Sequence, residues 1–168
     1  IYYSSNGSEK IKGQWDMGFA KDTTSIIEYW ENGNIKYKGG FNGNKWDGKG
    51  VVCYPNNDIC FEGIFSNGSA IKGSLKDDKG IRIFEGSLNN SGFCTIYYSS
   101  GNRFIEYTLT NDIYYKIKQY DSNGKIHFDG YILNKDNIFN LGEIDIIKLT
   151  DHIKSIFNNI KYISGKFY

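Results

Sequence analysis

Residues 37–43 read Tyr-Lys-Gly-Gly-Phe-Asn-Gly, and residues 61–68 read Phe-Glu-Gly-Ile-Phe-Ser-Asn-Gly. Both stretches carry the same five-residue pattern: apolar, charged, Gly, any residue, apolar. The middle position of this pattern falls at residues 13, 39, 63, 86, 107 and 130, and it is Gly everywhere except Tyr107. A pattern that recurs about every 21 to 26 residues indicates one supersecondary unit that is stacked several times.

The pattern has the two-residue period of a β-strand, in which successive side chains point to opposite faces. Tyr37, Gly39 and Phe41 are therefore expected on one face, and Lys38 on the other. Glycine inside a strand usually costs stability, so its recurrence indicates that a ring from an adjacent strand approaches closely. The alternative is that each glycine marks a β-bulge.

A pair of turn-forming residues precedes each copy of the pattern by a few residues. Asn-Gly is a strong signal for a two-residue hairpin turn, because both turn positions need a positive φ. The pairs are Asn6-Gly7, Asn32-Gly33, Asn56-Asn57, Lys79-Gly80, Gly101-Asn102 and Asn123-Gly124. Pattern and turns together predict an all-β fold, an antiparallel β-meander of about six stacked hairpin repeats in an elongated sheet.

The best-kept unit combines the stretch at 37–43 with Gly48-Lys49-Gly50 and Tyr54-Pro55-Asn56-Asn57. It resembles the MORN (membrane occupation and recognition nexus) repeat, which reads Tyr-Glu-Gly-x-Trp, Asn-Gly, Gly-x-Gly and Tyr-Pro-Asn-Gly. The resemblance covers residues 1–133 and is closest over 28–75. Departures are Phe for the usual Trp and the substitution at Tyr107.

The resemblance implies a non-catalytic scaffold or adaptor that binds another protein, at a membrane or at a cytoskeletal or ciliary structure. It also implies a weak phospholipid contact and a cytoplasmic or cytoskeleton-associated location. One alternative is an aromatic repeat module that binds carbohydrate or cell wall. Another is the accessory repeat region of a larger enzyme, which the start at Ile1 rather than Met leaves open.

The rhythm changes after Leu133, so residues 134–168 are expected to form a C-terminal capping segment. Apolar residues recur there at three- and four-residue steps, which is the helical period. They are Ile146, Leu149, Ile153, Ile156, Phe157 and Ile160. The spacing predicts one α-helix near residues 150–161 that caps the end of the repeat sheet.

No catalytic, cofactor or metal motif is present, so we expect neither an enzyme nor a bound cofactor or metal. The 20 Lys and Arg balance 19 Asp and Glu, which argues against a nucleic-acid partner held by bulk charge. No run of about 18 apolar residues predicts a transmembrane span, and no signal peptide is visible. Cys53 and Cys60 flank a predicted two-residue turn, so they are either buried free thiols or a cross-strand disulfide.

The three tryptophans Trp15, Trp30 and Trp46 all lie in the best-kept units, and we predict that they bind the partner. Trp46 is expected in a loop between Gly43 and Gly48, off the repeating core positions. A large aromatic residue at an exposed position is a typical interface anchor. The alternative is that Trp46 folds back over the neighbouring hairpin as a lid.

Overall fold

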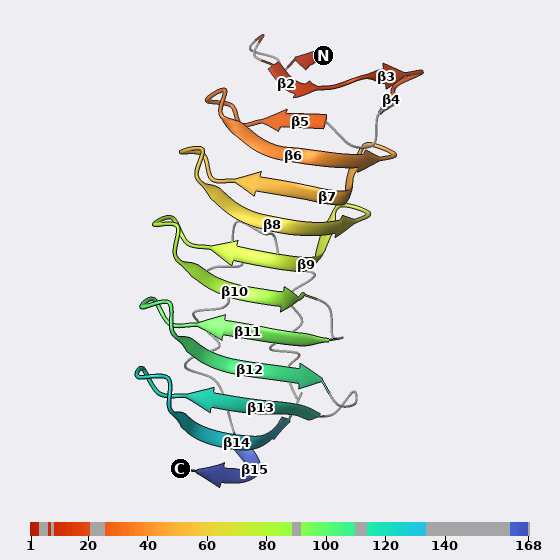
Figure 1. Cartoon of the computed structure of the whole chain (residues 1–168). Helices are drawn as coiled ribbons and strands as arrows, with labels where there is room; N and C mark the ends of the chain where they lie inside the picture. Colours follow the sequence, from red (N-terminus) through yellow and green to blue (C-terminus); the bar gives the residue numbers. More distant parts are fainter. Residues whose placement is uncertain are drawn as a thin grey trace. The chain divides into compact units, whose positions relative to one another are not determined.

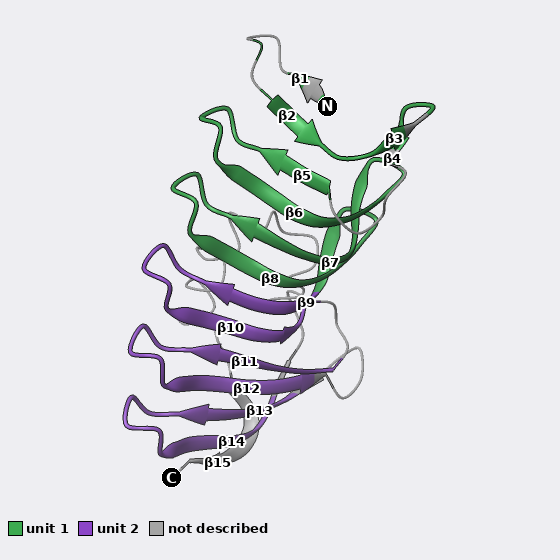
Figure 2. Cartoon of the chain, turned by 45° about the horizontal axis from the view of Figure 1, so that its top comes forward, with its two compact units in different colours: residues 1–71 green, residues 72–168 purple. Residues whose placement is uncertain are grey.

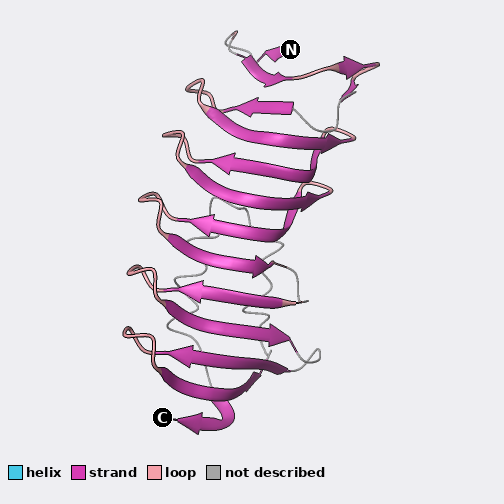
Figure 3. Ribbon diagram, in the orientation of Figure 1, coloured by secondary structure: helices cyan, strands magenta, loops and turns pink. Residues whose placement is uncertain are grey.

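The computed structural model describes residues 1–3, 7, 9–20, 26–88, 92–109, 114–133 and 162–167. The chain forms two compact units, residues 1–71 and residues 72–168 (Figure 2). Every regular element in the described part is a strand (Figure 3), so the all-β prediction is confirmed there. The helix predicted near 150–161 lies outside the described residues. Within them, no helix is long and apolar enough to cross a membrane.

Unit 1 is an antiparallel meander in which each strand pairs with the next along the sheet (Figure 1). A small separate hairpin, β3 with β4, interrupts the order between β2 and β5. The strands are β1 (Tyr2–Tyr3), β2 (Glu9–Lys12), β3 (Trp15–Asp16), β4 (Phe19–Ala20), β5 (Ile26–Tyr29), β6 (Ile35–Asn42), β7 (Lys45–Cys53) and β8 (Ile59–Ser66).

Unit 2 repeats this antiparallel arrangement. The boundary between the units falls inside β9 (Ser69–Lys76), and residues 72–76 of that strand pair with β10. The following strands are β10 (Arg82–Ser87), β11 (Phe93–Tyr97), β12 (Arg103–Leu109), β13 (Tyr114–Tyr120), β14 (Ile126–Leu133) and β15 (Tyr162–Phe167). The last strand was not expected from the sequence. It pairs with β14 after the long segment 134–161.

The alternation predicted from the repeat is confirmed by burial. Tyr37, Gly39 and Phe41 are buried on β6, whereas Lys38 is exposed. Phe61 and Phe65 are likewise buried on β8, on either side of Gly63. One face of each hairpin therefore holds the aromatic core, and the other face meets solvent.

Five of the six predicted turns lie where the sequence placed them, but their type differs from the prediction; the sixth, Asn6-Gly7, falls partly outside the described residues. The five are three-residue loops, as in the loop where Trp30 N–H donates to the Asn34 carbonyl (2.8 Å) and Gly33 N–H donates to the Trp30 carbonyl (2.9 Å). Only the third loop residue has a positive φ, as expected for a type I turn followed by one left-handed residue. These left-handed residues are Gly33, Asn57, Gly80, Gly101 and Gly124.

The extra loop residue also corrects the expected pairing of the two cysteines. Cys53 lies opposite Ile59, and Cys60 is an additional, bulged residue between Ile59 and Phe61. Both cysteines, together with Cys94, are buried free thiols. A two-residue turn would have placed Cys53 opposite Cys60. The loop has three residues instead, and the two cysteines are therefore not paired across the hairpin.

The same β-bulge follows each three-residue loop. In each case the strand after the loop has one extra, unpaired residue. In the first hairpin Tyr37 pairs with Glu28 and Ile35 pairs with Tyr29, so Lys36 between them has no opposite residue. The extra residues of the five hairpins are Lys36, Cys60, Ile83, Phe104 and His127. In the middle three hairpins this residue is apolar and buried, as is the residue that follows it. The repeat therefore packs a bulged side chain beside its first aromatic or apolar core position.

Candidate interaction surfaces

The three tryptophans predicted to bind a partner all belong to unit 1, and all are half-buried. Trp15 lies in β3, Trp30 directly follows β5, and Trp46 lies in β7 opposite Phe41. The expectation that Trp46 occupies a loop is therefore wrong. The loop is shorter than the glycine spacing indicated, because Gly43 and Asn44 alone make the turn, both with positive φ.

Trp46 is a packed part of the aromatic core of unit 1. Its indole stacks on Tyr37, with ring centroids 4.4 Å apart and planes 5° from parallel. Phe65 meets the indole edge-on at 5.5 Å. Trp46 Nε1 donates a hydrogen bond to Glu28 Oε2 (2.9 Å). These contacts are those of a ring folded over its neighbouring hairpin, which was the alternative to an exposed anchor.

Trp30 links one hairpin turn to the next. Its Nε1 donates to the carbonyl of Cys53 (3.0 Å), at the start of the following turn. Tyr98 makes the equivalent link in unit 2, where its hydroxyl donates to the carbonyl of Tyr120 (2.9 Å). An aromatic donor at this position therefore ties consecutive turns together, which explains why the sequence places an aromatic residue before several of them.

Lys36 fills the space between two of the tryptophans. Its Nζ lies 5.3 Å from the ring centroid of Trp30 and 5.6 Å from that of Trp46, both within range of a cation–π interaction. The same nitrogen forms an ion pair with Glu28 Oε1 (2.8 Å). We name the group of Glu28, Trp30, Lys36 and Trp46 the Lys36 cage.

The β3–β4 hairpin presents apolar side chains to solvent, a feature that the sequence analysis missed. Met17 is 94% exposed and Phe19 is 60% exposed. Met17 and Gly18 form a two-residue turn with φ of 46° and 85°. The matching turns of unit 1 use Gly43-Asn44 and Asn67-Gly68, residues that tolerate a positive φ. Met17 is therefore both strained and exposed.

Unit 2 carries two copies of an Arg–Glu–Tyr group on its solvent face. Arg103 forms an ion pair with Glu106 (2.6 Å), and the Tyr120 hydroxyl donates to the same carboxylate. Burial raises the pKa of Glu106, but the hydrogen bonds from Tyr120 and Arg103 outweigh it and leave this pKa below its ordinary value. Burial and then the bond to Glu106 raise the pKa of Tyr120 to about 12. The other copy contains Arg82, Glu85 and Tyr97.

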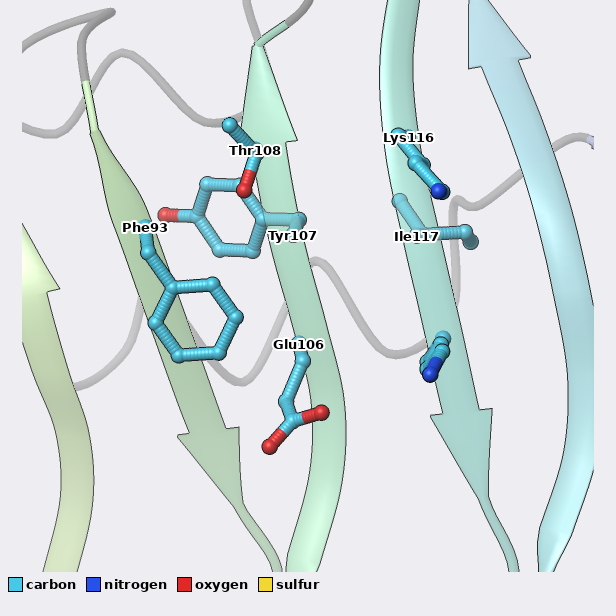
Figure 4. Close-up of a pocket in the computed structure, with 7 residues that line it drawn as sticks. Phe93, Glu106, Tyr107, Thr108, Lys116 and Ile117 are labelled. Carbon is cyan, nitrogen blue, oxygen red and sulfur yellow. The ribbon is translucent and has the colours of Figure 1, made fainter.

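Among the residues that the structure describes, two shallow hollows lie on the solvent face of the strands. The one in unit 1 has a volume of about 590 Å³ and is lined by residues 38–39, 49–51 and 62–64. The one in unit 2 has a volume of about 140 Å³, with Phe93 on one side and Lys116 on the other (Figure 4). Its only carboxylate, Glu106, is already bound to Arg103 and Tyr120.

In the described part of the chain the three cysteines are buried, whereas His127 is exposed. Burial raises the pKa of the Cys53 and Cys94 thiols, which makes them poor nucleophiles. His127 is exposed at the bulge of the last hairpin. Within the described ranges, no three His, Cys, Asp or Glu side chains are grouped so that they could hold a metal ion.

Comparison with known proteins adds no family assignment to this geometry. No family model matches the chain, and no curated protein matches it.

Proposed function

We propose that this chain is a MORN-like, non-catalytic scaffold or adaptor that binds another protein through unit 1. The repeated hairpin with one aromatic face and one solvent face supports the proposal, because stacked repeats offer long surfaces to elongated partners. The open, shallow form of the two hollows in the described residues also suits a binding surface. A cytoplasmic or cytoskeletal setting, with a weak phospholipid contact, belongs to the same proposal.

The observation that carries the proposal is the exposed tip of the β3–β4 hairpin. Met17 holds a strained backbone conformation and gains no burial from it. Strain that persists without a packing benefit is typical of functional positions. Phe19 stands two residues along and is also exposed, so two large apolar side chains share one hairpin tip. Exposed apolar and aromatic side chains of this kind are common anchors in protein interfaces.

The proposed interface still lies in unit 1, but it is centred on the β3–β4 tip and no longer includes Trp30 and Trp46. The indole N–H groups of Trp30 and Trp46 donate to the Cys53 carbonyl and to the Glu28 carboxylate. These two residues therefore hold the hairpins together. Trp15 stays with the proposed surface, because it lies on β3 beside the tip.

The test compares partner capture by three forms of the purified chain in an extract of its native source. The double variant Met17→Asn/Phe19→Ser removes both apolar side chains, and Asn suits the positive φ at position 17. The control is Ile59→Ser, which removes another exposed apolar side chain of unit 1. We expect at least one captured protein whose recovery, measured by mass spectrometry, falls about tenfold or more with the double variant and stays unchanged with the control. Equal recovery of every captured protein by all three forms would contradict the proposed surface.

A further inference from the structure

The Lys36 cage occupies a position that is apolar in the central repeats. Each bulged residue is followed by a core residue, which pairs with a residue on the neighbouring strand. In the three middle hairpins, the bulged residue and this residue on the neighbouring strand are both buried and apolar. These pairs are Cys60 with Val52, Ile83 with Leu75, and Phe104 with Ile96. In the first hairpin the same two positions hold Lys36 and Glu28. The last hairpin also holds polar residues there, His127 and Gln119, but the first hairpin places an ion pair at these positions. A charged pair at a position that is apolar in the central repeats loses hydrophobic stabilisation, so it calls for a functional explanation.

The walls of the cage are held in place by contacts that do not involve Lys36. Trp30 is fixed by the hydrogen bond from its Nε1 to the Cys53 carbonyl. Trp46 is fixed by stacking on Tyr37 and by its bond to Glu28 Oε2. Two indole rings and a carboxylate are therefore positioned in advance around one cation. Binding sites gain affinity when their groups are ordered before the ligand arrives.

Lys36 can leave the cage without burying its charge. Its side chain is 30% exposed, whereas that of Glu28 is 14% exposed. A lysine has a flexible four-carbon stem, so its ammonium group can move into water while the stem stays against the protein. The charge of Glu28 would then face two aromatic rings with no cation between them, which favours entry of another cation.

We propose that Trp30, Trp46 and Glu28 form a binding site for a quaternary ammonium group, whose place Lys36 takes in the free chain. Aromatic walls with a nearby carboxylate are suited to this ligand, because a quaternary ammonium presents methyl groups to the rings and needs no hydrogen-bond acceptor. It is also less strongly hydrated than the ammonium of lysine, so it loses less on entering the cage. Such a group occurs in choline compounds and in trimethylated lysine. The site goes beyond the scaffold function proposed above.

The test uses the indole N–H signals of the ¹⁵N-labelled chain, which contains three tryptophans. Tetramethylammonium chloride is titrated into the wild-type chain, with sodium chloride at equal concentrations as the control for ionic strength. We expect the signals of Trp30 and Trp46 to move in a saturable way, while that of Trp15 stays in place. Choline and Nε-trimethyllysine are then titrated in parallel, and the tighter of the two identifies the source of the group. The uncharged choline analogue 3,3-dimethylbutanol should move neither signal.

Two substitutions in the cage and one control outside it sharpen the result. Lys36→Ala removes the internal competitor and should tighten tetramethylammonium binding by about tenfold or more, because a site blocked most of the time shows a proportionally weaker affinity. Adding Glu28→Gln to this variant should abolish the gain. Lys38→Ala, which changes an exposed lysine of the same strand outside the cage, should bind as the wild type does.

Several outcomes would overturn the site. They are movement of all three indole signals together, no movement of any, equal binding of the uncharged analogue, or a Lys36→Ala affinity no better than that of the wild type. The wild-type titration decides the matter alone if Lys36→Ala does not fold.

Discussion

The phenol ring of Tyr37 on β6 covers Gly50 on β7 so closely that a Cβ at position 50 would lie 2.3 Å from the Tyr37 hydroxyl oxygen. The same hydroxyl oxygen would lie 2.6 Å from a Cβ at Gly39, the residue paired with Gly50. It donates to the Gly40 carbonyl (2.9 Å), which holds the ring over both glycines. The repeat glycine at position 39 therefore makes room for a ring of its own strand and for the backbone of β7, and not for a ring from an adjacent strand as predicted.

Replacing Gly50 by Ala should destabilise the chain by about 1–3 kcal/mol, because the added methyl group forces the Tyr37 ring out of its position. The matched control is Lys49→Ala, which alters the preceding, exposed side chain and should change stability by less than about 0.5 kcal/mol. Urea unfolding followed by circular dichroism measures both. Equal unfolding midpoints for the two variants would show that Tyr37 can move at no cost.

Replacing Trp46 by Ala should lower the free energy of unfolding by about 3 kcal/mol, since it removes a ring that stacks on Tyr37 and meets Phe65. Phe19→Ala is the comparison, because it also truncates an aromatic residue of unit 1 but an exposed one, and it should cost less than about 0.5 kcal/mol. Thermal and urea unfolding distinguish the two. If Trp46→Ala unfolds like the wild type, the indole is a surface anchor after all.

Asn57 is the one left-handed residue of the five equivalent loops that is not glycine, with φ of 77°. Ala lacks the local side-chain hydrogen bonding that helps Asn to adopt this conformation, so Asn57→Ala should destabilise the chain by about 1 kcal/mol. Asn57→Gly should leave stability unchanged or raise it slightly, since the four other loops use Gly there. Urea midpoints of the two variants measure the difference. The prediction is contradicted if Ala and Gly behave alike.

Glu106→Gln should destabilise unit 2 by about 1–2 kcal/mol near neutral pH, because the carboxylate accepts charge-assisted hydrogen bonds from Arg103 and Tyr120. Glu85→Gln is a matched control from the other Arg–Glu–Tyr group. Its carboxylate is 50% exposed against 15% for Glu106, so the change should cost less than about 0.5 kcal/mol.

The pH dependence of this difference follows from the lowered pKa of Glu106. A carboxyl group whose pKa is lower in the folded chain contributes stability above its unfolded pKa, and this contribution is lost as the pH falls through the folded pKa. The stability gap between the wild type and Glu106→Gln should therefore shrink in acid. Urea unfolding at a series of pH values below 5 measures it, and a gap that stays constant would assign the effect to packing.

Much of the fold was readable from local sequence. The apolar–charged–Gly pattern identified the paired strands, because strand side chains alternate at a fixed period of two. Asn and Gly identified the turns, because they tolerate a positive φ. The strand β15 was missed, although residues 163–167 read Ile-Ser-Gly-Lys-Phe and Gly165 lies opposite the repeat glycine Gly130. It was missed because Ser164 replaces the charged residue of the pattern and the segment 134–161 breaks the spacing of the repeat.

The candidate sites depended on tertiary structure. Composition and spacing singled out Trp15, Trp30 and Trp46. They could not show which of these indole N–H groups would form a hydrogen bond within the protein, as those of Trp30 and Trp46 do. The Lys36 cage was invisible in the sequence, because a β-bulge brings Lys36 and Glu28 together with two tryptophans that are 16 residues apart in the chain. The sequence by itself determined the period, the strands and the places where the chain turns, since these follow from the conformational preferences of single residues. Tertiary structure decided loop length, bulge position and burial, since each depends on how neighbouring hairpins register against one another, and a shift of one residue exchanges a buried side chain for an exposed one.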